Sequence, residues 1–114
     1  MIMIVEDNKQ MRETIRKFVS KIQPGNEFIE CSNGREAVEA YARHHPSLVL
    51  MDIQMKEMDG LRATAAIRRS FPDARIVIVT NFNDPDSREA AREAGVSGYV
   101  LKENLAEIRN FMPS

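Results

Sequence analysis

Short apolar runs alternate five times with segments of helical spacing, and this alternation limits the folds open to the chain more than any other feature. The runs lie at Ile2–Val5, Phe28–Ile29, Leu48–Met51, Ile76–Val79 and Tyr99–Leu101. A run without polar alternation is typical of a strand buried on both faces, as in a parallel sheet covered by helices. Each run is therefore predicted to form a strand of one parallel sheet.

The segments between the runs carry helix signals at their ends. Residues that can cap a helix precede them at Asn8, Asn33, Asp59, Asp84 and Asn104. Asn33 and Asn104 are each followed three residues later by a glutamate, which is the capping-box pattern. Proline or glycine ends four of the segments, at Pro24-Gly25, Pro46, Pro72 and Gly95.

A strand followed by a helix, repeated five times, predicts an α/β fold. Right-handed crossovers leave few topologies, and five strands suit the flavodoxin-like order 2-1-3-4-5, a doubly wound (βα)5 parallel sheet. The 114 residues are enough for a single domain with one core. The last helix, expected from about Asn104, is short before Pro113, so its final turn is expected outside residues 1–114.

Charge and hydropathy narrow the function. Sixteen Lys and Arg against seventeen Asp and Glu give a formal net charge of −1, which does not favour nucleic-acid binding by these residues. The apolar runs are too short to span a membrane, and the acidic start MIMIVED is unlike a signal peptide. The single cysteine, Cys31, allows no intrachain disulfide and fits a cytoplasmic protein.

The predicted strand order brings polar residues to one edge of the sheet. Ligands of such sheets bind beyond the carboxyl ends of the strands, at the switch point between strands 1 and 3. Glu6-Asp7 follows the first run and Asp52 the third, while Thr80 and Lys102 follow the fourth and fifth. These five side chains, from four strands, are therefore expected to converge.

Converging carboxylates repel one another unless a cation compensates, and Mg²⁺ prefers such oxygen ligands together with water and phosphate oxygens. Lys102 would add a point charge and Thr80 a hydrogen bond, which completes a cradle for a phosphoryl group. Asp52 can then act as the nucleophile that forms an aspartyl-phosphate. The pattern predicts a magnesium-dependent phosphoryl site.

Each residue alone also has a structural explanation. An aspartate after a strand most often caps a helix or forms a turn, and Glu6-Asp7 alone fits a solvated helix start. Thr80 alone is an ordinary strand end, Lys102 a surface lysine, and Tyr99 a half-buried packing residue of the last strand. Only their joint placement at one edge favours the functional interpretation.

Together these motifs resemble the receiver domains of two-component response regulators, over essentially the whole chain. The resemblance rests on Glu6-Asp7, on the DIQMKEMDG block from Asp52, on Thr80 after IVIV, and on GYVLK, which ends at Lys102. The stretch GVSGYVLKENLAEI is most similar to receivers of the NarL/LuxR class, which usually carry a helix-turn-helix DNA-binding domain.

The resemblance implies that Asp52 accepts a phosphoryl group from a sensor histidine kinase. It implies that Asp7 and Asp52 bind Mg²⁺, or another divalent cation such as Mn²⁺, with the backbone carbonyl of Gln54 as a further ligand. Glu6 would contribute through water. These assignments describe a switch that accepts a phosphoryl group on its own aspartate and removes it again by autodephosphorylation, rather than an enzyme acting on an external substrate.

The resemblance also implies how the switch is used. Thr80 and Tyr99 would be the switch pair, and Lys102 would assist phosphoryl transfer. The expected partners are the kinase, a second copy of the chain after phosphorylation, and DNA through a domain outside this chain. Residues 1–114 would then be the receiver domain of a longer cytoplasmic regulator, without membrane contact.

Three positions depart from the family pattern. Lys56 stands where proline is usual, which predicts a more mobile loop, and Glu103 stands where proline is often found after the lysine. Asn81 replaces a residue that is often small, which predicts narrower access to the phosphoryl group and slower loss of it.

Three other functions stay open. A stand-alone regulator would dock its switched face on a protein partner. An aspartate-dependent phosphatase would need a second acid two residues after Asp52, where the chain has Gln54. A pseudo-receiver that never accepts phosphate would typically lack an acid or the lysine, and this chain keeps all of them.

Overall fold

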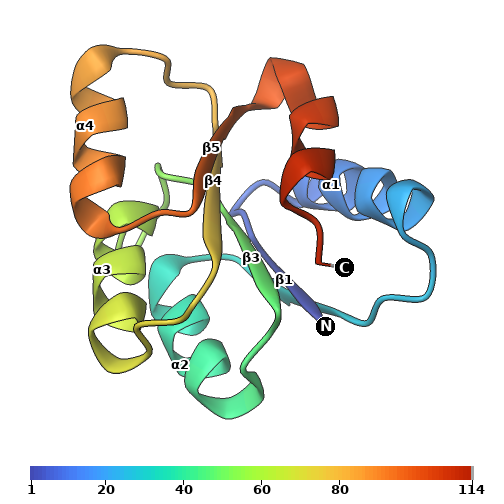
Figure 1. Cartoon of the computed structure of the whole chain (residues 1–114), viewed down its shortest axis with the longest axis horizontal. Coiled ribbons are helices and arrows are strands. Elements are labelled where there is room, and N and C mark those ends of the chain that lie inside the picture. The colour runs from blue at the N-terminus through green and yellow to red at the C-terminus, as the bar shows by residue number, and fades with distance from the viewer. Residues whose placement is uncertain (114) are drawn as a thin grey trace.

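The computed structural model describes residues 1–113 and contains one five-stranded parallel sheet (Figure 1). Its strand order, β2-β1-β3-β4-β5, confirms the predicted flavodoxin-like order. The strands also follow the apolar runs, although β2 is two residues longer than predicted, β4 includes the threonine that follows its run, and β5 begins one residue earlier, at Gly98. The strands are β1 Ile2–Val5, β2 Phe28–Cys31, β3 Leu48–Met51, β4 Ile76–Thr80 and β5 Gly98–Leu101.

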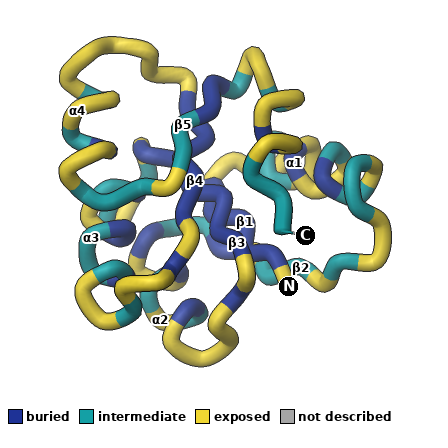
Figure 2. The backbone as a smooth tube through the Cα atoms, viewed as in Figure 1, coloured by how far each residue is buried: buried dark blue, intermediate teal, exposed yellow. Residues whose placement is uncertain are grey.

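Helices cover both faces of the sheet, and the apolar positions of the strands alternate between the two faces. Ile2 and Ile4 of β1 pack with α1 and the C-terminal helix η1, whereas Met3 and Val5 pack with α2, α3 and α4. β1, β3 and β4 consequently form the buried centre of the molecule, whereas the edge strands β2 and β5 are only partly buried (Figure 2). The helices are α1 Lys9–Ile22, α2 Gly34–His44, α3 Gly60–Ser70, α4 Pro85–Ala94 and the 3₁₀ helix η1 Lys102–Phe111.

Four of the five predicted caps are confirmed. The side chains of Asn8, Asn33, Asp59 and Asp84 each accept a hydrogen bond from a backbone N–H in the first turn of α1, α2, α3 and α4. The capping box of α2 is shifted by one residue, because the carboxylate of Glu36 accepts from the backbone N–H of Ser32 at 3.0 Å. These caps start α1, α2 and α4 soon after the preceding strand, whereas the longer loop 52–59 separates β3 from α3.

The predicted capping box at Asn104 is wrong. The helical segment η1 begins at Lys102, directly after β5, and has no side-chain cap there. It is kinked at Asn104, whose non-helical backbone angles (φ −126°, ψ 48°) separate a first short piece from the helix that follows. A helix therefore does start after Asn104, as predicted, but without the predicted capping bond. Tertiary packing outweighs the local signal here, since Ile108 is fully buried on the α1 side and the ring of Phe111 lies against Gly98. These tertiary contacts, and not a capping residue, therefore hold η1 in place.

No helix within residues 1–113 has both the length and the apolar character that crossing a membrane would require.

Gly60 begins α3 and packs against the backbone at the end of β3, so a larger residue at this position should lower the stability of the fold. Its N–H donates to the carbonyl of Ile53 at 2.8 Å, and a Cβ at this position would lie 1.8 Å from the carbonyl oxygen of Asp52. Gly60→Ala should therefore lower the free energy of unfolding by about 3 kcal/mol, because the backbone must move to accommodate the methyl group.

Gly25→Ala is the matched control for urea unfolding of the Gly60 variant. Gly25 has a positive φ of 92° but no atom within 4 Å of the added Cβ, so only backbone strain of about 1 kcal/mol is expected. Equal losses in the two variants would contradict the proposed steric role of Gly60.

Candidate functional site

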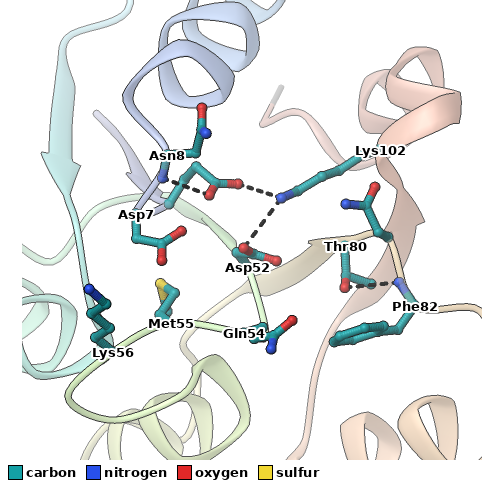
Figure 3. A pocket seen from close by; sticks show the side chains of 11 residues that line it. Asp7, Asn8, Asp52, Gln54, Met55, Lys56, Thr80, Phe82 and Lys102 are labelled. Carbon is teal, nitrogen blue, oxygen red and sulfur yellow. Dashed lines mark hydrogen bonds and ion pairs between the residues drawn. The ribbon is translucent and has the colours of Figure 1, made fainter.

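The carboxyl ends of four strands line a cavity of about 490 Å³ (Figure 3). Val5 of β1 pairs with Met51 of β3, and the backbone N–H of Asp52 donates to the carbonyl of Val5 at 2.9 Å. The pairing of Thr80 with Leu101 places Lys102 next to the end of β4. The structure thus brings the predicted residues together in one cavity, lined by Glu6, Asp7, Asn8, Asp52, Gln54, Met55, Lys56, Thr80, Asn81, Phe82 and Lys102.

Three carboxylates form the acidic side of the cavity. Glu6, Asp7 and Asp52 each offer one oxygen atom, and these atoms lie within 4.8 Å of one another. Glu6 and Asp52 are buried, whereas Asp7 is exposed. The cluster is therefore open to solvent on the Asp7 side and closed on the side of the core.

Lys102 joins the two buried carboxylates. Its Nζ lies 2.7 Å from Oε1 of Glu6 and 3.3 Å from Oδ2 of Asp52, and its side chain is only 11% exposed. The other carboxylate oxygens accept from the backbone, Glu6 Oε2 from Asn8 at 3.0 Å and Asp52 Oδ1 from Ile53 at 2.9 Å. These bonds fix the orientation of both carboxylates.

Burial sets the protonation preferences of the site. It raises the pKa of Glu6 and of Asp52, and the attraction of Lys102 only partly opposes this effect. Burial alone would lower the pKa of Lys102, but the carboxylates of Glu6 and Asp52 outweigh it, and the pKa of Lys102 is raised. One ammonium group thus faces three acids, and the ionised cluster retains negative charge.

The residues fit a divalent cation. Glu6 Oε1 is buried, and the partner that holds it is the ammonium of Lys102 at 2.7 Å. Carboxylate oxygens beside an accessible cavity are the ligands that Mg²⁺ and Mn²⁺ take, and a cation would compensate the remaining charge. Gln54, whose carbonyl is a predicted ligand, lines the same cavity.

Thr80 and Tyr99 are connected through the backbone of Phe82, which the sequence did not single out. The N–H of Phe82 donates to Oγ1 of Thr80 at 3.2 Å, and the hydroxyl of Tyr99 donates to the carbonyl of Phe82 at 2.7 Å. The guanidinium of Arg88 lies 4.5 Å from the centre of the Tyr99 ring. Tyr99 therefore lies outside the cavity lining and contacts the loop after β4 instead.

The three departures from the family pattern have different locations. Lys56 and Asn81 both line the cavity, so neither the loop lysine nor the bulkier amide is remote from Asp52. Glu103 lies in the first turn of η1. The mobility of the loop and the slower loss of phosphate stay predictions.

Comparison with known proteins agrees with this geometry. The family model described as "Response regulator receiver domain" matches residues 2–112. The transcriptional regulatory protein LiaR of Bacillus subtilis is 35% identical over 106 residues, which are 92% of this chain and 50% of LiaR. The chain spans about half the length of the curated relatives it matches.

Solved structures show the same similarity. A two-component response regulator of the LuxR family from Aurantimonas sp. SI85-9A1 superposes with a TM-score of 0.89 at 34% identity, over 96% of this chain and 79% of that chain. The signal receiver domain of the putative response regulator NarL from Mycobacterium tuberculosis superposes with a TM-score of 0.87 at 27% identity, over 96% and 90% of the two chains.

Replacing Asp52 by asparagine should stabilise the metal-free chain at neutral pH. Because burial raises the pKa of Asp52, the folded chain holds its proton more tightly than the unfolded chain does. The ionised carboxylate therefore lowers the free energy of unfolding at every pH above its folded pKa, and this cost vanishes below the ordinary value of 3.8. Asp52→Asn should raise the free energy of unfolding by about 1 kcal/mol at neutral pH.

Urea unfolding of the metal-free chain in EDTA, between neutral pH and about pH 4, measures this gain. The gain should shrink as the pH falls. Asp73→Asn, which removes an exposed acid, is the control and should change little. A destabilised Asp52→Asn chain at neutral pH would refute the expected electrostatic cost.

Proposed function

The chain belongs to the family of response regulator receiver domains, and on that basis we propose that it is a phosphorylation-controlled switch with Asp52 as the phosphoacceptor. The observation that carries the proposal is the position of Asp52, whose Oδ2 faces Lys102 at the border of an acidic, solvent-open cavity. A buried carboxylate with a fixed orientation and an adjacent ammonium is prepared for attack on a phosphoryl group.

The roles follow from the contacts of each side chain. The backbone N–H of Ile53 holds Oδ1 of Asp52, which leaves Oδ2 as the attacking atom. Lys102 lies near enough to stabilise the negative charge that develops on the phosphoryl oxygens. The phosphoryl donor we propose is the phosphohistidine of a sensor histidine kinase, with the imidazole as leaving group.

Asp7, Asp52 and the backbone carbonyl of Gln54 would hold Mg²⁺ or Mn²⁺, with Glu6 contributing through water. A divalent cation in this cluster would neutralise charge on the phosphoryl oxygens. The remaining task of these side chains is structural: Glu6 keeps Lys102 in the cavity by its 2.7 Å ion pair, and Asp7 keeps the solvent side acidic.

Thr80, Phe82 and Tyr99 would carry the signal out of the cavity. A phosphoryl group on Asp52 offers oxygen acceptors to the hydroxyl of Thr80, which now accepts from the Phe82 N–H. If Thr80 turns toward it, the loop that accepts the Tyr99 hydroxyl must adjust as well. The face formed by α4, β5 and η1 would then differ between the two states.

The output we propose is transcriptional. Relatives such as LiaR are described as transcriptional regulatory proteins and are about twice as long as the matched region. A DNA-binding domain outside residues 1–114 would be controlled by the switched face, through a phosphorylation-dependent homodimer. The net charge of −1 on these residues agrees with DNA contact elsewhere in the protein.

Incubation with acetyl phosphate and Mg²⁺ should add one phosphoryl group to the chain, measured by intact mass. Asp52→Asn should abolish the added mass, because the nucleophile is gone. Asp59→Asn, which alters the helix cap of the same loop, is the control and should still be phosphorylated. Full labelling of Asp52→Asn would refute the assignment of the phosphoacceptor.

Phosphorylation should shift backbone amide resonances of Phe82, Arg88 and Tyr99 as well as those of the cavity. Thr80→Ala should confine the shifts to the cavity, because the hydroxyl that links the phosphoryl group to Phe82 is absent. Two-dimensional NMR of the phosphorylated chain measures both effects. Unshifted Tyr99 and Arg88 amides in the phosphorylated wild type would exclude this route.

A further inference from the structure

We propose that Arg12 is a positioning residue for the acidic pair Glu6-Asp7, an inference that rests on the proposed function of the cavity. Arg12 lies in the first turn of α1 and is absent from the cavity lining. Its Nη1 donates to the backbone carbonyl of Glu6 at 2.7 Å, and its Nε donates to Oε1 of Glu30 at 3.0 Å. Arg12 therefore acts on the cavity only through the backbone.

The bond to the Glu6 carbonyl controls the direction of Asp7. The carbonyl of Glu6 and the N–H of Asp7 belong to one planar peptide unit, so fixing the carbonyl oxygen also fixes the plane from which Asp7 continues. The N–H of Glu6 is held separately, by the carbonyl of Cys31 at 3.0 Å. Arg12 and Cys31 thus hold the peptide units on either side of the Glu6 Cα.

Among the three acids, Asp7 depends most on the backbone for the position of its carboxylate. Glu6 and Asp52 are held by Lys102 and by backbone N–H groups. Within residues 1–113, in contrast, no hydrogen bond or ion pair holds the exposed carboxylate of Asp7, which faces the cavity in Figure 3. The place of this carboxylate therefore depends on its backbone more than the places of the other two acids do.

Glu30 of β2 keeps Arg12 in the required orientation. Oε1 of Glu30 accepts from Arg12, and Oε2 accepts from Arg16 at 2.6 Å. Burial alone would raise the pKa of Glu30, but the two arginines outweigh this effect and hold its pKa below the usual value. Glu30 thus stays ionised, and the Arg12 side chain, which is 18% exposed, is held between Glu30 and Glu6.

Arg16 provides a matched control for Arg12. Both arginines lie on the same helix and bond to the same carboxylate, but only Arg12 also donates to the Glu6 carbonyl. Arg12→Ala and Arg16→Ala each remove one positive charge and one ion pair with Glu30. A difference between the two variants at the acidic pair therefore reports the Glu6 bond and not the charge or the ion pair.

The test is an Mg²⁺ titration of the ¹⁵N-labelled chain, followed by the amide resonances of residues 6–8, with order parameters from relaxation of the metal-free chain. Arg12→Ala should raise the Mg²⁺ dissociation constant by about tenfold, the loss expected when support of a metal ligand is removed. It should also lower the order parameter of the Asp7 amide. Arg16→Ala should change the dissociation constant by less than about twofold, as for an exposed ion pair.

Arg12→Lys extends the test to a variant that keeps the charge and the aliphatic stem. Lysine is a point charge without the planar fork that reaches two partners at once, so partial weakening of Mg²⁺ binding is expected. This variant decides the question if Arg12→Ala does not fold, which thermal unfolding of each variant will show.

The outcomes distinguish the proposed role of Arg12 from the proposed function of the cavity. Equal Mg²⁺ affinities in Arg12→Ala and Arg16→Ala overturn the role of Arg12, as does wild-type affinity in Arg12→Lys or an unchanged Asp7 order parameter in Arg12→Ala. Those results leave the proposed function intact, provided that the wild-type chain binds Mg²⁺ and is phosphorylated. A wild-type chain that binds no Mg²⁺ overturns the proposed metal site and, with it, the inference about Arg12.

Discussion

The ammonium group of Lys102 between the buried carboxylates of Glu6 and Asp52 is the interaction on which the site depends. These residues come from the ends of three strands that are far apart in the sequence, and they meet because β1 lies beside β3 and β4 beside β5. A single positive charge leaves the cluster acidic, which suits the divalent cation and the phosphoryl group that we propose for this site. Burial raises the pKa of both carboxylates, so keeping them ionised in the folded chain lowers its free energy of unfolding.

The apolar sheet supplies the stability that this charged edge requires. β1 and β3 are buried on both faces, against α1 and η1 on one side and against α2, α3 and α4 on the other. Burial of this kind is the dominant favourable term in folding, and it can offset the free energy lost where carboxylates are desolvated. The charges lie at the strand ends, where the loops reach solvent, so the core itself stays apolar.

Backbone groups help to orient the two buried carboxylates and connect Thr80 with Tyr99. Asn8 and Ile53 hold the two buried carboxylates through their N–H groups, and Phe82 connects Thr80 with Tyr99 through its own N–H and carbonyl. A change in the conformation of the loop after β4 therefore alters the hydrogen bonds of Thr80 and of Tyr99 at the same time. A switch needs such coupling, because a phosphoryl group can favour one conformation only through interactions that differ between the two.

The sequence by itself determined the sheet order and the convergence of the acids, Thr80 and Lys102. Apolar runs and capping residues are local signals, and strand ends in a doubly wound sheet meet by general rules of topology. Only the tertiary structure decided that η1 begins directly after β5 and kinks at Asn104, that Phe82 joins Thr80 to Tyr99, and that Arg12 reaches the Glu6 carbonyl. These features depend on distances between atoms from separate segments, and neither spacing nor residue type reports such distances.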